Sequence, residues 1–320
     1  MAIEAIKNAI DGVYEYPDPA DSEFRRALTD FYDGALEPDQ FITGNSGVAL
    51  LQMIVQAFLG EGLECIFSYP GFSPYKMFPL KIGANSINVP LMDPDFALDV
   101  EGILGAITEH TRLIWLSSPN NPTGSYISKT SMDSLMDQIP DDIIVVYDEV
   151  YFQYVDADDY VRGLPYVHAG KKVIAINSFS KAYGLAGLRV GYAYSSAEIA
   201  RYVSQLRRPF QINSLSCKGA IAALKDEDHI KRTVENNTRE KEWLYKELDQ
   251  LPIKYWPTQA NFILIDPARD PQEFEKAMQT QGIMVRPTGG FGSPNTIRVT
   301  IGTHEANVAY IRGLRQVLSK

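Results

Sequence analysis

The chain has 320 residues, of which 45% are hydrophobic and 22% are charged, a composition ordinary for a folded soluble protein. The formal net charge is -10, which argues against nucleic acid or an anionic membrane as a partner, because both require a basic surface. The length favours one large domain and one smaller domain.

The sequence also bears on disulfides, targeting and metal binding. Cysteine occurs only at Cys65 and Cys217, so we expect no disulfide framework. The N-terminal string MAIEAIKNAI lacks the features of a secretory signal, and no apolar run reaches membrane-spanning length. We therefore expect a cytoplasmic protein. The four histidines are scattered without metal-ligand spacing, so no metal site is expected.

In chain order, the first strong element is a long apolar helix that starts at Asn45 or Ser46 and stops at Gly60. Continuous apolar runs then predict four strands, at 64–69, 112–117, 142–148 and 172–177. Such runs indicate strands buried on both faces. Strands alternating with helical patterns predict an α/β fold with a mostly parallel sheet flanked by helices.

The rest of the chain differs in pattern. Residues 196–250 are helical and more charged, and a long helix there is expected to link the two domains. The tail predicts an α+β unit, with strands at 260–266, 283–287 and 296–302 and helices at 272–281 and 304–319. We expect an N-terminal segment (1–30) packing on the small domain or a partner subunit, a large domain (31–210) and a small C-terminal domain (211–320).

Each of the four buried strands runs directly into a polar or glycine- and proline-rich loop. These loops are PGFSPY, SPNNPTG, DEVYFQY and SFSKAYG. Ligands of open α/β sheets bind beyond the carboxyl ends of the strands, so the four loops predict one site.

Lys181, in SFSKAYG, is the first candidate residue of that site. A lysine amine attacks a carbonyl when its pKa is lowered, and an imine to pyridoxal phosphate would use it in this way. Ser178, Ser180 and Arg189 could hold the phosphate of such a cofactor. The alternative is a solvated lysine at the start of a helix.

Asp148 ends the run DIIVVYD and would be partly desolvated unless a basic group pairs with it. A pyridinium nitrogen is one such partner; an ordinary helix cap is the alternative. Tyr151 and Asn121 could reach a ring oxygen, and Phe72 could stack on a flat ring, although each could equally be a turn or packing residue.

Anionic groups have two further candidate sites. The helix opened by GNSGV could receive a phosphate at Ser46 and Gly47, although no GxGxxG or Walker pattern suggests a nucleotide. In the small domain, Arg298 and Arg286 could bind an anionic substrate group. A structural ion pair is the alternative for Arg298.

Taken together, the strings SPNNPTG, YDEVY, SFSKAYGLAGLRVGY, ANFILI and RVTIGT resemble the fold-type I pyridoxal-phosphate enzymes. Within them the chain is most similar to the histidinol-phosphate aminotransferase branch of class I/II aminotransferases. The resemblance implies that Lys181 binds the cofactor covalently and that Asp148 pairs with its ring nitrogen. It further implies the following roles: Asn121 and Tyr151 at the ring oxygen; Phe72 on the ring; Ser178, Ser180, Arg189, Ser46 and Gly47 at the phosphate; Arg298 at the substrate carboxylate or its equivalent.

The resemblance also implies a homodimer, because Tyr16, in YEYPDP, matches a tyrosine that reaches the neighbouring subunit's site. Two departures from the family stand out: the chain starts without the usual N-terminal arm, and Gly47-Val48-Ala49 replaces a Ser-Asp-Glu string.

The expected activity is transfer of an amino group from an amino acid or amine to a 2-oxo acid such as 2-oxoglutarate. Histidinol phosphate or an aromatic amino acid is the expected donor. Two alternatives stay open: a related pyridoxal-phosphate lyase or decarboxylase acting on a phosphorylated amino acid, and a non-catalytic pyridoxal-phosphate-binding protein.

Overall fold

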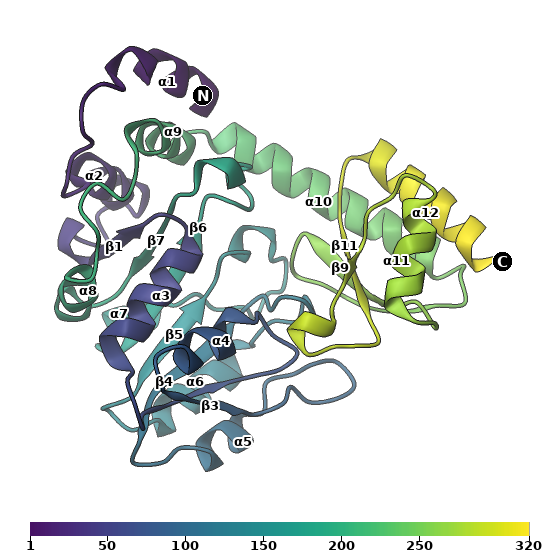
Figure 1. The fold of residues 1–320 in the computed structure, drawn as a ribbon, viewed down its shortest axis with the longest axis horizontal. Coiled ribbons are helices and arrows are strands. Elements are labelled where there is room, and N and C mark those ends of the chain that lie inside the picture. The colour runs from purple at the N-terminus through teal and green to yellow at the C-terminus, as the bar shows by residue number, and fades with distance from the viewer. Residues whose placement is uncertain (320) are drawn as a thin grey trace.

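The computed structural model describes residues 1–319 and contains two β-sheets joined by a long helix (Figure 1). The strands of the large sheet, in chain order, are β1 (Phe41–Gly44), β2 (Glu64–Phe67), β3 (Asn85–Asn88), β4 (Thr111–Ser117), β5 (Ile144–Asp148), β6 (Val173–Ser178) and β7 (Gly191–Tyr194). The small sheet contains β8 (Lys254–Trp256), β9 (Phe262–Asp266), β10 (Arg286–Pro287) and β11 (Ile297–Thr300).

The α-helices are α1 (Ala2–Ala9), α2 (Ser22–Phe31), α3 (Gly47–Phe58), α4 (Pro74–Leu80), α5 (Val100–Gly105), α6 (Lys129–Gln138), α7 (Leu164–His168), α8 (Ala197–Ser204), α9 (Ser214–Leu224), α10 (Glu227–Leu248), α11 (Pro271–Gln279) and α12 (His304–Leu318). Short 3₁₀ helices are η1 (Ile10–Gly12), η2 (Pro38–Gln40), η3 (Phe152–Tyr154), η4 (Ala186–Leu188) and η5 (Gly289–Phe291). No helix within residues 1–319 is both long and apolar enough to cross a membrane.

The large sheet has the strand order β1-β7-β6-β5-β4-β2-β3 and is mostly parallel, as predicted. Only β7 runs against its neighbours, pairing antiparallel with both β1 and β6. The other neighbouring pairs are parallel, so the carboxyl ends of β4, β5 and β6 lie together at one edge.

Helices cover both faces of this sheet because its central strands are apolar on both sides. Val145 and Tyr147 of β5 belong to a core shared with α2, α5, α6, α7 and α9. Ile144 and Val146 belong to a second core, shared with α3, α4 and α8. Successive side chains of a strand point to opposite faces, so every second residue of β5, counted from Val146, faces α3 and α4.

The small sheet has its own core with α10, α11 and α12, which confirms the predicted smaller α+β unit. Helix α10 contains 22 residues, and at 1.5 Å per residue it spans about 33 Å, from the side of α9 to the small sheet (Figure 1). Helix α9 packs against α1 and α2, and its apolar residues share the large-sheet core. The domain division expected near residue 210 therefore stays a prediction.

Candidate active site

The carboxyl ends of β4, β5 and β6 and the start of α3 surround a pocket, at the place in an open α/β sheet where ligands bind. Its lining residues are Ser46, Gly47, Val48, Leu51, Phe72, Tyr75, Ser117, Asn121, Asp148, Val150, Tyr151, Ser178, Ser180, Lys181 and Arg189. The predicted site residues are therefore gathered around one pocket, with three exceptions: Tyr16, Arg286 and Arg298. Their individual roles stay predictions.

Strand alternation explains which side chains reach the pocket. Asp148 follows Val146 on the face covered by α3 and α4, and Ser117 of β4 lies beside it. On β6 its neighbour is Ile176, and Ser178 lies two residues later on the same face. Glu149, the next residue of the chain, is buried with the side chains of the opposite face. Two adjacent carboxylates thus have separate surroundings, and only Asp148 lines the pocket.

Asp148 is buried, with 6% of its surface exposed. Its Oδ2 atom accepts a hydrogen bond of 2.7 Å from the Tyr75 hydroxyl, and its Oδ1 atom accepts a longer one of 3.3 Å from the Val150 amide. Burial raises the pKa of this carboxyl, while the Tyr75 bond, the Val150 amide and the charge of Lys181 act in the opposite direction. A cation in the pocket would therefore relieve the cost of burying the charge.

Lys181 lies on the turn that follows β6. The Ser180 amide donates to Ser178 Oγ at 3.1 Å, and the Gly184 amide donates to the Lys181 carbonyl at 2.9 Å, which fixes the turn. The Lys181 amine lies 5.0 Å from the centre of the Tyr151 ring. Among residues 1–319, no carboxylate lies within 4.0 Å of this amine. A partly buried lysine without an ion pair, facing a pocket, has the setting that a nucleophilic amine requires.

The start of α3, which also lines the pocket, has features that bind anions. Helix α3 begins at Gly47 after Ser46, whose φ of 86° and ψ of 161° lie in a region that only glycine occupies readily. The first amides of a helix lack intrahelical acceptors, and they carry the positive end of its dipole. Glycine at position 191 allows the backbone of β7 to lie close to the start of α3, because a Cβ atom there would lie 2.8 Å from the Gly47 nitrogen. Arg189, which is exposed and has a φ of 52°, lines the same pocket and adds a positive charge to it.

The SPNNPTG loop carries Asn121 and is held by its neighbours. The Asn120 side chain donates to the Pro70 carbonyl at 2.9 Å and to Thr123 Oγ1 at 2.8 Å. Because Pro70 is close to Phe72 in the chain, the first of these bonds holds two walls of the pocket together. The Asn121 side-chain oxygen accepts a hydrogen bond from the Arg298 guanidinium of the small sheet.

Arg298 and Arg286 lie opposite each other on the antiparallel strands β11 and β10. Burial and the neighbouring Arg286 charge lower the pKa of Arg298. Arg298 lies over the rings of Phe262 and Phe291, with its guanidinium carbon 4.9 Å and 5.6 Å from their centres. No carboxylate of residues 1–319 lies within 4.0 Å of either guanidinium. Within that part of the chain, an ion pair to a carboxylate therefore does not explain Arg298.

Tyr16 lies outside the pocket. It is 84% exposed, and its ring centre is 4.8 Å from that of Phe210. It follows η1 and lines a shallow surface hollow beside the start of α9. Its expected role in a neighbouring subunit stays a prediction.

Tyr75 is a pocket residue to which the sequence analysis assigns no role. It lies three residues after Phe72, in the first turn of α4, and its side chain is directed at Asp148. Its spacing of three residues from Phe72, the candidate stacking residue, is a signal in the sequence that could have placed Tyr75 at the pocket. Its partner, however, lies 73 positions away and only the fold brings the two together.

The pocket fits pyridoxal phosphate. Asp148 Oδ1 has only one weak donor and can accept a bond from a protonated ring nitrogen. The Lys181 amine, which has no carboxylate partner in the described part of the chain, can attach the aldehyde, and the start of α3 can receive the phosphate.

Comparison with known proteins agrees with this geometry. A family model described as "Aminotransferase class I and II" matches residues 1–313. The chain is 38% identical over 319 residues to a protein of Moorella thermoacetica named histidinol-phosphate aminotransferase, covering 99% of this chain and 82% of that one. It is 34% identical to histidinol-phosphate aminotransferase 2 of Carboxydothermus hydrogenoformans, covering 98% and 86%.

Solved structures share the fold. The histidinol-phosphate aminotransferase of Sinorhizobium meliloti, solved in complex with pyridoxal-5'-phosphate, superposes with a TM-score of 0.88 at 24% identity, covering 99% of this chain and 86% of that one. A protein of Erwinia carotovora atroseptica described as a putative histidinol-phosphate aminotransferase gives 0.92 at 20% identity, covering 98% and 91%. At these identities the likeness concerns the fold alone.

The match over nearly the whole chain and the 38% identical relative decide the family. They also set aside the lyase and the non-catalytic readings that the motifs left open. The chain belongs to the class I and II aminotransferase family, and its expected identity as a pyridoxal-phosphate-dependent aminotransferase is confirmed.

Proposed function

We propose that the chain transfers the amino group of histidinol phosphate to a 2-oxo acid such as 2-oxoglutarate. The observation that carries this proposal is the pair of guanidiniums at Arg286 and Arg298, opposite each other on adjacent strands beside the pocket. Two arginines that have no carboxylate partner among residues 1–319 suit a phosphate, which carries more charge and more acceptor oxygens than a carboxylate. The names of the relatives support the same donor.

Bound pyridoxal phosphate supplies an electron-accepting ring that stabilises negative charge at the carbon losing its proton. Lys181 would hold the cofactor and, once displaced by the incoming amine, would take the proton from the substrate carbon and return it as general base and acid. Asp148 would keep the ring nitrogen protonated, an electrostatic contribution that exists before the substrate arrives.

The remaining pocket residues would orient the cofactor. Asn121 and Tyr151 would contact the ring oxygen, and Phe72 would cover one face of the ring. The phosphate would lie between the start of α3, at Ser46 and Gly47, and the side chains of Ser178, Ser180 and Arg189.

Both substrates would use the same arginines in turn. The phosphate of the donor would contact Arg298 and Arg286, and the carboxylate of the 2-oxo acid would later occupy the same place. Because Arg298 also donates to Asn121, anion binding would be linked directly to a residue at the cofactor ring.

An aromatic amino acid is the second candidate donor. Phe262 and Phe291 place two aromatic rings beside Arg298, which would suit a donor with an aromatic side chain and a carboxylate.

We further propose that the chain works as a homodimer in the cytoplasm. The N-terminal segment leaves large apolar side chains exposed, among them Ile10, Val13 and Tyr14, and Tyr16 lies with them. Such a surface suits a partner subunit.

Steady-state assays with 2-oxoglutarate as acceptor test the donor. We expect kcat/KM for histidinol phosphate to exceed that for histidinol by at least 100-fold, because the phosphate contacts are lost with histidinol. Phenylalanine and tyrosine, assayed in parallel, address the second candidate. Faster turnover of an aromatic amino acid than of histidinol phosphate would overturn the proposed donor.

A further inference from the structure

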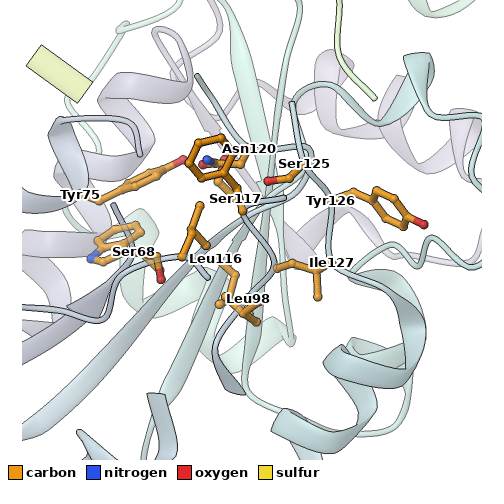
Figure 2. A pocket seen from close by; sticks show the side chains of 12 residues that line it. Ser68, Tyr75, Leu98, Leu116, Ser117, Asn120, Ser125, Tyr126 and Ile127 are labelled. Carbon is orange, nitrogen blue, oxygen red and sulfur yellow. The ribbon is translucent and has the colours of Figure 1, made fainter. Parts of the chain in front are cut away.

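Tyr75 joins three elements of the cofactor pocket. It belongs to α4, it is 3% exposed, and its hydroxyl donates to Asp148 at the end of β5. Its ring stacks on Trp115 of β4, with ring centres 5.4 Å apart and an interplanar angle of 14°. Figure 2 shows Tyr75 and Ser117 among the side chains around a small cavity next to the pocket, and both residues line the pocket as well. Packing therefore fixes the ring from which the hydroxyl reaches Asp148.

The direction of the hydrogen bond follows from the charges. Burial and the neighbouring Asp148 raise the pKa of Tyr75 well above its ordinary value, so the phenol keeps its proton at neutral pH. An ionised carboxylate has no proton to donate. Tyr75 is therefore the donor, and the bond of 2.7 Å is of the charge-assisted kind.

We infer that Tyr75 is a positioning residue that acts on the cofactor ring through Asp148. Its hydroxyl occupies Oδ2, which leaves Oδ1 for the ring nitrogen and fixes the plane of the carboxylate. A donor on Oδ2 also makes the carboxylate less basic, so the proton shared between Asp148 and the ring stays on the ring. This inference rests on the proposed role of Asp148.

The other groups around Asp148 do not hold its carboxylate by a side-chain hydrogen bond within the described residues. Lys181 faces the carboxylate from the turn after β6 and lowers its pKa through its charge, whereas Glu149, on the other face of the sheet, raises it. Tyr151 lies on the following loop and contacts the Lys181 amine through its ring. Within residues 1–319, Tyr75 is the one side chain that donates a hydrogen bond to Asp148.

The test replaces Tyr75 with Phe, which keeps the ring on Trp115 and removes only the hydroxyl. Tyr166→Phe is the matched control, because the Tyr166 hydroxyl donates to Asp133 at 2.6 Å outside the pocket. Both proteins are loaded with pyridoxal phosphate. The measurements are cofactor affinity, the pH at which the absorbance of the bound cofactor changes, and kcat and KM separately.

For Tyr75→Phe we expect kcat to fall by about 10-fold to 100-fold, the loss of one hydrogen bond to a charged group, with KM changing little. The pH of the absorbance change should rise, because a less positive ring withdraws less charge from the nitrogen bound at Lys181. Cofactor affinity should fall. Tyr166→Phe should leave all these quantities as in the unmodified protein.

A double-mutant cycle separates this role from a purely structural one. If Tyr75 acts through Asp148, Tyr75→Phe should have almost no further effect on kcat in an Asp148→Asn background. Additive losses, or an absorbance titration identical to that of the unmodified protein, would overturn the inference. Failure of the unmodified protein to bind pyridoxal phosphate at Lys181 would instead refute the proposed function itself, and the two failures are thus distinct.

Discussion

The Arg298 guanidinium donates a hydrogen bond to the Asn121 side-chain oxygen, so one bond links the small sheet to the cofactor pocket of the large one. A second contact crosses the same boundary, where the Gly71 amide donates to the Phe291 carbonyl at 2.9 Å. Asn121 and Gly71 lie in loops that follow strands of the large sheet, and Gly71 immediately precedes Phe72. Arg298, which is predicted to bind the substrate anion, is therefore in direct contact with a residue that lines the cofactor pocket.

Replacing Arg298 with Lys tests this arrangement. Lysine keeps the positive charge but cannot grip an anion and the Asn121 oxygen with one planar group. We expect kcat/KM for histidinol phosphate to fall by roughly 10-fold to 100-fold, the equivalent of losing a charge-assisted hydrogen bond. Arg315→Lys is the control, because Arg315 pairs with Glu247 on the exposed side of α12. Equal kinetics for the two variants would contradict the assignment of Arg298.

Replacing Arg286 with Gln separates the phosphate from other substrate groups. The side chain is exposed beside Arg298, and its loss should weaken binding of a dianionic phosphate more than binding of a carboxylate. We expect KM for histidinol phosphate to rise at least several-fold, while KM for a non-phosphorylated donor changes little. The measurement is the ratio of the two KM values, and an equal rise for both donors would argue that Arg286 does not recognise phosphate.

Asp148→Asn should change activity and stability in opposite directions. The amide cannot hold a positive ring nitrogen, so we expect kcat to fall by about 100-fold to 1000-fold, the scale of losing a preorganised electrostatic partner. Burial raises the folded-state pKa of this carboxyl above its unfolded value. Its contribution to folding is therefore favourable below the unfolded pKa and is lost as the pH rises through the folded pKa.

The cofactor-free Asp148→Asn protein should thus have a higher Tm than the unmodified protein at pH 7, and the difference should shrink as the pH falls through the raised pKa. Thermal unfolding across this pH range, with cofactor removed from both proteins, gives the measurement. A Tm difference that is independent of pH would contradict the role of the buried charge.

Arg162→Met should destabilise the large domain. Glu149 is fully buried and accepts hydrogen bonds from Arg162, Asn177, Tyr194 and the Gly163 amide, at 2.8 to 3.0 Å. Removing the arginine leaves a buried carboxylate without its cation, at a cost of about 3–5 kcal/mol. Urea unfolding monitored by circular dichroism measures the loss. Glu149→Gln, which removes the charge and keeps the shape, should cost less, and the reverse order would contradict this account.

Sequence pattern predicted the buried strands better than the edges of the sheet. Strands β4, β5 and β6 are continuous apolar runs, and such runs are a strong signal. The edge strand β3 has the sequence NSIN, with both ends exposed, and offers no apolar period to detect. Strands β1 and β7 are fully buried, but each has only four residues, and β8 has three, so none of them carries a run long enough to detect.

For the site, local strings identified Lys181 and Asp148 because each follows a strand that carries its own signal. The contacts of Tyr75 with Asp148 and of Arg298 with Asn121 were not predictable from the strings. Their partners lie 73 and 177 positions apart, and only the order of the strands and the placement of the small sheet bring them together.

Complementation between two inactive variants tests the proposed homodimer. Lys181→Ala lacks the amine that acts on the substrate, and Tyr16→Ala lacks the exposed ring expected to enter the partner's pocket. If Tyr16 serves the partner, a mixed dimer has one pocket with both residues intact and one with neither. Each pure variant should have little activity, and unfolding and refolding the two together should restore roughly a quarter of the unmodified activity, the share expected from random pairing into closed two-fold dimers. In the control for refolding, Lys181→Ala is mixed with Lys218→Ala in place of Tyr16→Ala; this change removes an exposed lysine that pairs with Glu23. No recovery beyond the sum of the pure variants, with dimers present by analytical ultracentrifugation, would place the action of Tyr16 within its own subunit.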